Sequence, residues 1–433
     1  MRHDLGRGEA KMRFAQFSIS CVGLLFLAVI TAAAQPQYKV IYSFGASQND
    51  ASYPNGGLVF DNQGNLYGTS QLGGLHGCMQ ECGTIFQLTP SPDGTWTENV
   101  IYEFCSEPNC ADGGNPGAGL VSDSAGNLYG TTRQGSTGCG VVGCGTVFEL
   151  SPPLAPGGSW SYTVLWNFGG NDLNDGAIPS GRLTWGVSGN LFGTTEIGGA
   201  NQGEGTVFEL SPAQAGGWNE SVLYTFCPNG LFECGDGAGP LAGVSLDASG
   251  NLYGTTFHGG AEGEWGVLYK LSPDGNAGAW AETVLYKFLG RSGANPSSAV
   301  NFDQSGNAYV TAYDGLFEAA CGGVFKFQPK GRKQSRLFLT GESGCNPLAG
   351  VSIDPRSGNL YGTASTGGKN GSGSIYEVSE TGRLSTIYSF CSQPNCADGQ
   401  APIGNLDYDA GKIYSTTSQG GAFNQGVVFE VTP

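Results

Sequence analysis

The side chains best suited to chemistry in this 433-residue chain are carboxylates, a few aromatic residues and cysteines. Four aspartates recur just before a glycine and a few residues before a proline. Because Ca²⁺ seeks carboxylate oxygens and hydroxyl groups donate to them, a ring of these aspartates would bind Ca²⁺ or a polyol. They can instead form Asx-turns that begin a strand, and their repetition favours that interpretation, so no cofactor other than such a Ca²⁺ ion is expected. The aspartates are Asp112, Asp175, Asp236 and Asp398.

A second candidate site consists of residues that break the pattern of their neighbours. An exposed tryptophan beside carboxylates is suited to stacking on a sugar ring and bonding its hydroxyl groups. The tryptophan can equally pack on its own loop, so a ligand-binding and a packing interpretation both remain open. The residues are Trp265, Glu262, Glu264 and His258 in one predicted loop and His76 in another.

Cysteine spacing predicts disulfide bonds. One of the 13 cysteines, Cys21, lies in the N-terminal 34 residues, which leaves an even number for the rest of the chain. Closely spaced cysteines also bind zinc, but zinc sites usually combine two such pairs, often with histidine, and histidines are scarce here. We therefore predict disulfides, with Cys321 and Cys345 left to pair with each other. The other predicted pairs are Cys78–Cys82, Cys105–Cys110, Cys139–Cys144, Cys227–Cys234 and Cys391–Cys396.

Residues 1–34 have the pattern of a secretory signal peptide. A basic stretch comes first, an apolar run follows over residues 19–30, and Ala32-Ala33-Ala34 offers a cleavage site. Met12, within the basic stretch, is an alternative start of translation to Met1. Since no second apolar segment follows, the processed protein is expected to be secreted, extracellular or periplasmic, without a transmembrane segment.

Composition narrows the class of protein further. The chain has 75 glycines and 21 prolines but only 13% charged residues, and 11% of its residues are aromatic. Frequent turn formers, together with enough aromatic residues for a core, favour many short strands over helices or disorder. A formal net charge of −17 argues against nucleic acid as a partner, because phosphate binding requires a basic surface. The sequence contains no G-x-S-x-G, H-E-x-x-H or phosphate-loop motif, so no enzyme class is indicated.

A motif related to G-N-L-Y-G-T-T recurs seven times, at intervals of about 52–63 residues. Three other short runs with strand character accompany the copies, so one repeat accounts for four strands. A D-x-x-G-N turn joins the first two strands, and G-T-V-F-E-L forms the third. Four antiparallel strands repeated seven times predict an all-β protein, a seven-bladed β-propeller formed as a single domain by residues 35–433.

The order of the strands predicts how the ring closes. Residues 38–44 have the pattern of a fourth strand without the first three, and residues 426–433 that of a third strand without the fourth. Pairing these two runs would build one blade from both ends of the chain and would leave no open edge. We therefore expect the N-terminal strand to contribute to the stability of the whole ring.

Two aromatic positions recur in the repeats. A tyrosine or phenylalanine inside the motif is expected to pack between blades, and a tryptophan just before the fourth strand is expected to cover the sheet faces. The loops that carry the cysteines are longer than the turns at the other ends of the strands, so a binding site is expected on the cysteine-bearing face. The recurring tryptophans are Trp96, Trp160, Trp218 and Trp280.

A basic cluster lies at the predicted turn before the fourth strand of the fifth repeat. Such a cluster can serve as a docking patch, although a solvated turn is the simpler interpretation in an acidic chain. Its residues are Lys326, Lys330, Arg332, Lys333 and Arg336.

The quoted motifs resemble those of the GloVer tandem repeat family of secreted bacterial proteins, over nearly all of residues 38–433. The resemblance implies a propeller-like repeat fold and an exported protein. It implies no activity, because the function of that family is uncharacterised. Some members carry a C-terminal sorting anchor, and none follows the last motif here, which implies a freely secreted or periplasmic protein.

Two functions follow as hypotheses. The first is a secreted binding or scaffolding module, a monomer that recognises carbohydrate or a cell-surface partner through its cysteine-bearing face. The second is a carbohydrate-active hydrolase or lyase that uses carboxylates at the mouth of the central channel. An enzyme requires two or three blade-specific polar side chains in one pocket, whereas a binding module requires a shallow, aromatic-lined surface.

Overall fold

The computed structural model describes residues 36–433 apart from several short stretches, and the predicted signal peptide lies outside the described residues. Residues Pro36–Pro433 form one compact unit. A search of the described residues finds no helix long and apolar enough to cross a membrane. The internal stretches left out are 76–81, 137–142, 156, 170–172, 202, 229–233, 261–263, 276–277, 291–292, 316–320, 329–333 and 410.

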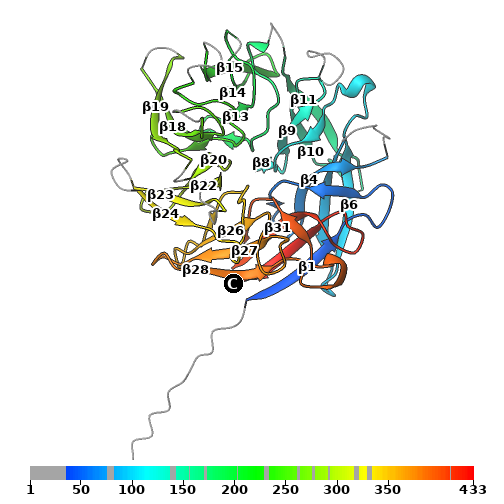
Figure 1. Cartoon of the computed structure of the whole chain (residues 1–433). Coiled ribbons are helices and arrows are strands. Elements are labelled where there is room, and N and C mark those ends of the chain that lie inside the picture. The colour runs from blue at the N-terminus through cyan, green and yellow to red at the C-terminus, as the bar shows by residue number, and fades with distance from the viewer. Residues whose placement is uncertain are drawn as a thin grey trace, which may run out of the picture. The chain divides into compact units, whose positions relative to one another are not determined.

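The unit consists of seven antiparallel sheets, which are the blades of a seven-bladed β-propeller (Figure 1). We label the four strand positions of a blade a to d from the centre outward; in blades 1, 2, 5 and 7 two short strands both pair with strand b and together occupy position a. Blades 1 and 2 contain β2 (Ala51–Pro54), β3 (Val59–Phe60), β4 (Leu66–Gly73), β5 (Thr84–Pro90) and β6 (Trp96–Glu103), then β7 (Gly114–Pro116), β8 (Val121–Ser122), β9 (Leu128–Gln134), β10 (Thr146–Ser151) and β11 (Ser161–Asn167). Blades 3 and 4 contain β12 (Thr184–Trp185), β13 (Leu191–Thr195), β14 (Thr206–Pro212) and β15 (Trp218–Thr225), then β16 (Ser245–Leu246), β17 (Leu252–Thr256), β18 (Val267–Pro273) and β19 (Trp280–Lys287).

The remaining blades follow the same order. Blades 5 and 6 contain β20 (Ala294–Pro296), β21 (Asn301–Phe302), β22 (Ala308–Asp314), β23 (Gly323–Phe327) and β24 (Gln334–Phe338), then β25 (Ser352–Ile353), β26 (Leu360–Ala364), β27 (Ser374–Val378) and β28 (Leu384–Ser389). Blade 7 contains β29 (Gln400–Pro402), β30 (Asp407–Asp409), β31 (Lys412–Gln419), β32 (Val427–Thr432) and β1 (Gln37–Ser43). Two 3₁₀ turns, η1 (Pro108–Cys110) and η3 (Pro394–Cys396), lie in loops after strand d.

The residues of the G-N-L-Y-G-T-T motif pair strands b and c within a blade, as blade 2 illustrates. Leu128 is buried in the core. Gly130 lies against the ring of Phe148 in β10, and a Cβ atom at Gly130 would come within 2.6 Å of Cζ of that ring. Thr132 Oγ1 lies 2.8 Å from Thr146 Oγ1, also in β10. The motif therefore recurs because close packing and a buried hydrogen bond both require these residue types.

The first threonine of the motif joins neighbouring blades. Thr69 Oγ1 in β4 donates to the backbone oxygen of Ala118 in blade 2 at 2.9 Å. Blade 7 is joined to blade 1 in the same way, since Thr416 Oγ1 donates to the oxygen of Gly56 at 3.2 Å. Each of these buried hydroxyl groups is thus satisfied across a blade boundary, which avoids the cost of an unpaired polar group.

The turn between strands a and b is bonded to the motif tyrosine. In blade 1, Asp61 Oδ2 accepts from Tyr67 OH at 2.9 Å and from Asn65 Nδ2 at 2.7 Å. In blade 3, Gly186 stands where the aspartate would be and Phe192 where the tyrosine would be, so acceptor and hydroxyl are absent together. A tyrosine in blade 3 would lack this acceptor for its hydroxyl group.

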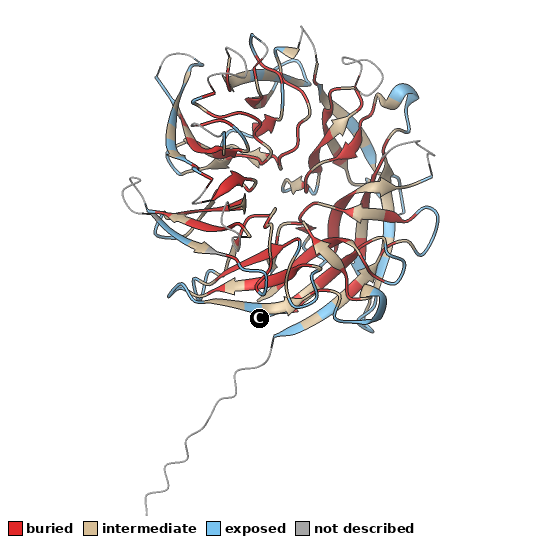
Figure 2. Ribbon diagram, in the orientation of Figure 1, coloured by how far each residue is buried: buried red, intermediate tan, exposed pale blue. Residues whose placement is uncertain are grey.

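Aromatic residues fill the boundaries between blades, where many side chains are buried (Figure 2). At three boundaries the tryptophan at or directly before the start of strand d packs in T-shaped contact against the motif aromatic residue of the preceding blade. The ring centroids lie 5.8 Å apart for Trp160 and Tyr67, 6.5 Å for Trp218 and Tyr129, and 6.3 Å for Trp280 and Phe192. Trp96 packs against the cluster that contains Tyr414, between blades 7 and 1. The interblade packing predicted for the motif aromatic residue is confirmed at these boundaries.

The first strand of the unit is the outermost strand of blade 7. β1 pairs antiparallel with β32, with Tyr38 opposite Val431. The Tyr38 ring stacks on that of Tyr388 in blade 6, with centroids 3.8 Å apart, and its hydroxyl donates to the backbone oxygen of Asp398 at 2.5 Å. β1 therefore contributes to blade 7 and also contacts blade 6.

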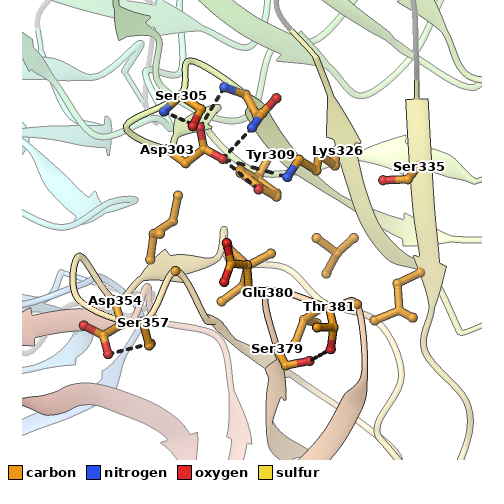
Figure 3. A pocket seen from close by; sticks show the side chains of 18 of the residues that line it. Asp303, Ser305, Tyr309, Lys326, Ser335, Asp354, Ser357, Ser379, Glu380 and Thr381 are labelled. Carbon is orange, nitrogen blue, oxygen red and sulfur yellow. Dashed lines mark hydrogen bonds and ion pairs between the residues drawn. The ribbon is translucent and has the colours of Figure 1, made fainter.

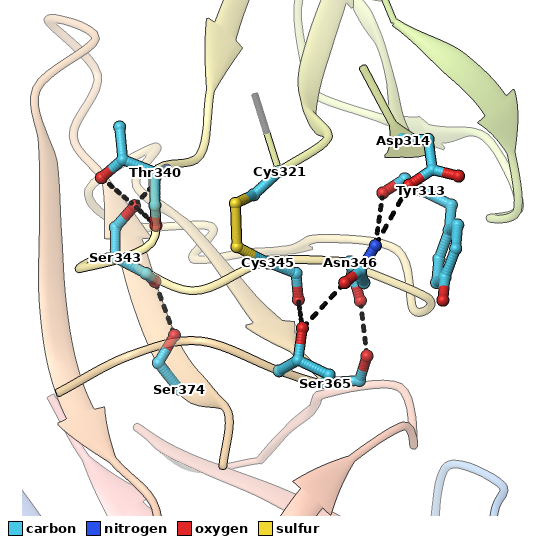
Figure 4. The surroundings of a disulfide bond; sticks show 10 residues. Tyr313, Asp314, Cys321, Thr340, Ser343, Cys345, Asn346, Ser365 and Ser374 are labelled. Atoms are coloured by element: carbon cyan, nitrogen blue, oxygen red, sulfur yellow. Dashed lines mark hydrogen bonds between the residues drawn. A yellow bond between two sulfur atoms is a disulfide. The ribbon is translucent and has the colours of Figure 1, made fainter. Parts of the chain in front are cut away.

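The loops from strand d to strand a and from strand b to strand c lie at one end of the blades, which we call the disulfide face. Cys321 and Cys345 join two such loops, beside the hydrogen bonds of Asn346 and Ser343 to neighbouring chain segments (Figure 4). Cys82 and Cys144 are also disulfide-bonded, and their predicted partners Cys78 and Cys139 lie outside the described residues. The other predicted pairs that the structure confirms are Cys105–Cys110, Cys227–Cys234 and Cys391–Cys396.

Candidate functional site

The residue that follows the motif differs between most blades, although the motif itself repeats. It lies at or just beyond the end of strand b that reaches the disulfide face. Such residues of neighbouring blades contact one another there: Arg133 pairs with Glu196, and the rings of Phe257 and Tyr313 lie 6.5 Å apart. We call this set the variable ring. A single ligand site in a repeat protein requires residues that differ between repeats, and the variable ring supplies them. Its members are Gln71, Arg133, Glu196, Phe257, Tyr313, Ser365 and Ser418.

Glu196 is held in place by two neighbours. Its Oε2 atom accepts from Arg133 Nη2 at 2.8 Å and from Ser180 Oγ at 3.1 Å. Arg133 is the penultimate residue of β9 in blade 2, and Ser180 follows a proline that recurs before strand a. The contacts orient one carboxylate of blade 3, and the ion pair joins it to blade 2.

A cavity of about 420 Å³ lies beside Glu196, on the disulfide face between blades 3 and 4. Three glutamates and one histidine line it together with apolar side chains. The ring of His258 lies in T-shaped contact with that of Phe257, with centroids 4.9 Å apart. The principal lining residues are Glu196, Glu204, Glu264, His258, Ile197, Leu241 and Phe257.

The cavity brings together two of the residues singled out from the sequence, His258 and Glu264. Trp265 does not line it. This side chain is half-buried and packs against the cluster that contains Leu268 and Phe288, between blades 4 and 5. Glu262 and His76 lie outside the described residues.

Sequence reasoning missed three residues that line this cavity, Glu196, Glu204 and Phe257. Glu196 and Phe257 each follow a copy of the repeated motif directly. A change of residue type at a fixed position beside an otherwise repeated motif was therefore the signal that could have found them. Glu204 carries no comparable signal, because it lies in a b–c loop of irregular length.

The recurring aspartates bond to their own loops. Asp112 Oδ2 accepts from Tyr102 OH at 2.8 Å and from the backbone nitrogen of Ser106 at 2.9 Å, and Asp398 repeats this arrangement with Tyr388 and Ser392. Burial raises the pKa of Asp398, but the hydrogen bonds from Ser392 and Tyr388 outweigh it and lower that pKa overall. These carboxylates therefore hold the loop that precedes strand a.

The other two aspartates have similar partners. Asp236 Oδ2 accepts from Tyr224 OH at 2.9 Å and from the backbone nitrogen of Cys227 at 3.1 Å, and Asp175 Oδ1 accepts from the backbone nitrogen of Gly169 at 3.2 Å. Within the residues that the structure describes, no three histidine, cysteine, aspartate or glutamate side chains are placed to hold one metal ion.

Three partly buried glutamates on the outer strands have raised pKa values. Burial and the nearby charge of Asp175 raise the pKa of Glu220 to about 8. Burial and the charge of Asp236 raise that of Glu282 to about 7. Glu98, which faces Asp50, is raised for the same two reasons. None of these three glutamates is among the described residues that line the cavity beside Glu196.

A second cavity, of about 600 Å³, lies where the strands at position a converge. Residues from blades 2 to 7 line it, including Arg182 and Asp407. Burial raises the pKa of the Asp407 carboxyl group, and the charge of Arg182 opposes that rise. The central channel of the ring thus contains a charged pair.

Seven four-stranded antiparallel sheets around a channel, with the site residues at one end, define the class of seven-bladed β-propeller repeat proteins. Within that class the chain belongs to the Gloeobacter/Verrucomicrobia repeat family, whose sequence model matches residues 27–231 and 222–429. Comparison with curated proteins found no match.

Solved structures with a similar fold include two of low sequence identity. One is PorZ, described as an essential surface component of the type-IX secretion system of Porphyromonas gingivalis, with 13% identity and a TM-score of 0.51 over 87% of this chain and 46% of PorZ. The chain thus spans less than half of PorZ. The other is the polysaccharide lyase Uly1, with 11% identity and a TM-score of 0.50 over 93% of this chain and 94% of the lyase. At such identities the likeness extends to the fold alone.

Proposed function

We propose that this protein is a binding module that holds a neutral sugar or an amino sugar in the cavity beside Glu196. The observation that carries the proposal is the convergence of residues that break the repeat pattern, among them Glu196, Phe257 and His258, on one cavity. Residues that repeat from blade to blade serve packing and loop structure instead. Concave sites with a few polar groups among apolar ones are typical of small-ligand binding.

The lining favours a polyhydroxylated ligand. Carboxylate oxygens of Glu204 and Glu264 are acceptors for sugar hydroxyl groups, and charge-assisted hydrogen bonds of this kind are stronger than neutral ones. Phe257 and Leu241 offer apolar contact for the C–H groups of a sugar ring. Glu196 is already oriented by Arg133 and Ser180, so its side chain would lose less conformational entropy when a ligand binds.

The charge of the cavity argues against an acidic sugar. Three glutamates line it, and the nearby cation Arg133 is paired with Glu196. A uronate would bring a further carboxylate beside these charges, and juxtaposed like charges disfavour binding. This favours neutral or amino sugars over the uronate-containing polymers that many lyases cleave.

The same arrangement favours binding over glycoside hydrolysis. A hydrolase requires one carboxyl group that remains protonated near neutral pH beside a second, ionised one. The glutamates with raised pKa values, Glu98, Glu220 and Glu282, lie on β6, β15 and β19 rather than around the cavity. The alternative of a carbohydrate-active hydrolase or lyase is therefore the less supported proposal.

The experiment is retention of the purified protein on a panel of insoluble polysaccharides that includes neutral, amino-sugar and uronate polymers, with analysis of released products. We expect retention on a neutral or amino-sugar polymer without products. Phe257→Ala and Glu264→Gln should each weaken retention by about tenfold, which corresponds to about 1.4 kcal/mol. Gln71→Ala is the matched control, because Gln71 holds the equivalent position in blade 1 and does not line the cavity.

Each outcome separates the hypotheses. Retention that survives Phe257→Ala and Glu264→Gln would contradict the site, and failure to bind any polymer would contradict carbohydrate as the ligand. Retention on uronate polymers alone would contradict the charge argument. Release of products would contradict the binding module and support the carbohydrate-active enzyme.

We also propose that the protein is exported after removal of residues 1–34. Disulfide bonds on one face support this, because they persist in oxidising compartments. Cell fractionation with N-terminal sequencing of the processed chain tests it, and a reduced, uncleaved protein in the cytosol would contradict it.

A further inference from the structure

Four blade boundaries are covered, on the face opposite the disulfide face, by a tryptophan at one register position, at or directly before the start of strand d. In blade 2 this is Trp160, two residues before Tyr162, which lies opposite Leu150. In blade 6 the residue opposite Val378 is Leu384, so the equivalent position is occupied by Gly382. The boundary between blades 5 and 6 therefore lacks this tryptophan.

A second aromatic residue is missing from the same boundary. The second residue of β12 is Trp185, whose ring centroid lies 4.9 Å from that of Tyr129 in the preceding blade. At the equivalent position of blade 5, Phe302 lies 5.1 Å from Tyr253. Blade 6 has Ile353 there. Among the described residues, no aromatic ring stacks on Tyr309, the motif tyrosine of this boundary, or contacts its edge. Lys326 Nζ lies 5.2 Å from its ring centroid, and its hydroxyl donates to Asp303 Oδ2 at 3.0 Å.

A cavity of about 690 Å³ occupies this position (Figure 3). Apolar side chains of both blades line it, among them Val324, Leu337 and Ile353. Asp303, Tyr309 and Lys326 lie along one side of the open space, and Ser379, Glu380 and Thr381 along the other. The space that an indole ring helps to fill at other boundaries is thus open here and has charged groups at its margins.

We infer that this cavity receives a tryptophan or another large aromatic side chain from an extended segment of a partner polypeptide. At four other boundaries of the same chain, an indole ring occupies the equivalent register position and packs on the motif aromatic residue or its cluster. An aromatic side chain here would bury apolar area against both blades and make the edge contact with Tyr309 that its counterparts make. Aromatic residues that enter pockets are the usual energetic anchors of protein interfaces.

The margins of the cavity favour a peptide over a free aromatic compound. Lys326 lies on the blade 5 side, and Asp354 and Glu380 lie on the blade 6 side. Groups of both signs suit the amides and mixed side chains that flank an aromatic residue in a polypeptide. The volume also exceeds that of one indole ring, which leaves room for neighbouring residues. This site lies on the opposite face from the proposed carbohydrate site and does not depend on it.

The experiment is selection of a random 12-residue peptide library on the purified protein, followed by affinity measurement on Ile353→Trp. This substitution places a tryptophan at the position that Trp185 holds in blade 3, so a side chain of the protein itself fills the cavity. We expect the selected peptides to contain tryptophan, tyrosine or phenylalanine, and to lose at least tenfold affinity for Ile353→Trp. Binding to Gln71→Ala, on the disulfide face, should be unchanged.

Stability measurements make the substitution interpretable. Ile353→Trp should melt at or above the temperature of the parent protein, because the indole ring fills the open space between blades 5 and 6 with apolar contact. If Ile353→Trp fails to fold, Thr381→Trp in the exposed turn at the margin replaces it as the blocking variant. Absence of enriched peptides, enrichment of peptides without aromatic residues, or full affinity for a folded blocking variant would each overturn the inference.

Discussion

Arg182 and Asp407 are 225 positions apart in the chain, and their side chains meet in the centre of the ring, with Nη1 and Oδ1 3.3 Å apart. Arg182 Nε also donates to the oxygen of Leu120 in blade 2 at 2.8 Å, and Asp407 Oδ2 accepts from the nitrogen of Leu58 in blade 1 at 2.6 Å. One ion pair thereby connects blades 1, 2, 3 and 7. The propeller is held together at its axis as well as at the boundaries between blades.

Removal of one partner of this pair should destabilise the whole ring. Asp407→Ala would leave Arg182 and the backbone nitrogen of Leu58 without their acceptor, which costs about 1–3 kcal/mol in the free energy of unfolding. Lys412→Ala, which breaks the more exposed pair of Lys412 with Glu430, should cost at most about 1 kcal/mol. Urea unfolding of both variants measures the difference. Equal losses would show that the central pair contributes no more than a surface pair.

Stability should fall as pH rises from about 5 to 8. The pKa values of Glu220 and Glu282 are raised to about 8 and about 7 in the folded state, against about 4.3 in an unfolded chain. The folded protein thus holds protons that the unfolded chain has released in this window, and a rise in pH favours unfolding. Thermal melts should give a higher Tm at pH 5 than at pH 8.

The double variant Glu220→Gln, Glu282→Gln tests the origin of that pH dependence. Because an amide keeps the shape of the side chain without the charge, the variant should lose much of the difference in Tm between pH 5 and pH 8. Glu107→Gln, at an exposed position, serves as the control. An undiminished pH dependence in the double variant would assign the effect to other groups.

Disulfide bonds should contribute to stability according to the loops that they close. Cys321–Cys345 spans 24 residues and Cys105–Cys110 spans five. Loop-closure entropy assigns about 3 kcal/mol to the longer loop and about 2 kcal/mol to the shorter one. Reducing agent should lower the Tm, and replacement of Cys321 and Cys345 by serine should lower it more than the same change at the shorter pair. A Tm insensitive to reduction would contradict a stabilising role.

Loss of the Tyr38 side chain should weaken the contact between blades 6 and 7. Tyr38→Ala removes the stacking on Tyr388 and the hydrogen bond to Asp398, and because the side chain is only partly buried the change should cost about 2 kcal/mol, less than for a fully buried tyrosine. Lys39→Ala changes the neighbouring residue of β1 at an exposed contact and serves as the control. If both variants unfold at the same denaturant concentration as the parent protein, β1 does not stabilise the ring.

Trp265 should matter for stability rather than for ligand binding. Because its half-buried side chain packs against the cluster of Leu268 and Phe288, Trp265→Ala should cost about 2 kcal/mol, less than a fully buried tryptophan. Glu264→Ala, one residue earlier and exposed, should cost little. Parallel unfolding and polysaccharide-retention measurements separate the two roles. If Trp265→Ala keeps native stability but loses retention on the polysaccharide, Trp265 belongs to the ligand site.

The repeated parts of the fold could be predicted from the sequence because local interactions determine them. The glycine of the motif lies against an aromatic ring, the threonines bond across strands and blades, and the acidic turn bonds the motif tyrosine. Each requirement recurs in several blades, so a single sequence displays it several times. Strand order followed from the same repetition, whereas the described disulfide pairs followed from the spacing of the cysteines.

The candidate sites were less accessible because they depend on contacts between blades. The variable position after the motif marks Arg133 and Glu196 one by one, but nothing local shows that they meet, since their contact requires blades 2 and 3 to be neighbours. The cavity beside Tyr309 follows from an absent tryptophan, which becomes visible once strand register places Gly382 at that position. Trp265 seemed exceptional by residue type, yet its surroundings are those of a packing residue.

The pairing of β1 with β32 has a consequence for the order in which the molecule assembles. During synthesis, the earliest strand of the propeller must wait for the latest one, and meanwhile its apolar side chains and unpaired amides are exposed. The last pairing event that closes the ring therefore joins the two strands that are farthest apart along the chain. This predicts slow last-stage folding and a risk that nascent copies exchange this strand with one another. A chaperone or low local concentration would be most useful in that interval.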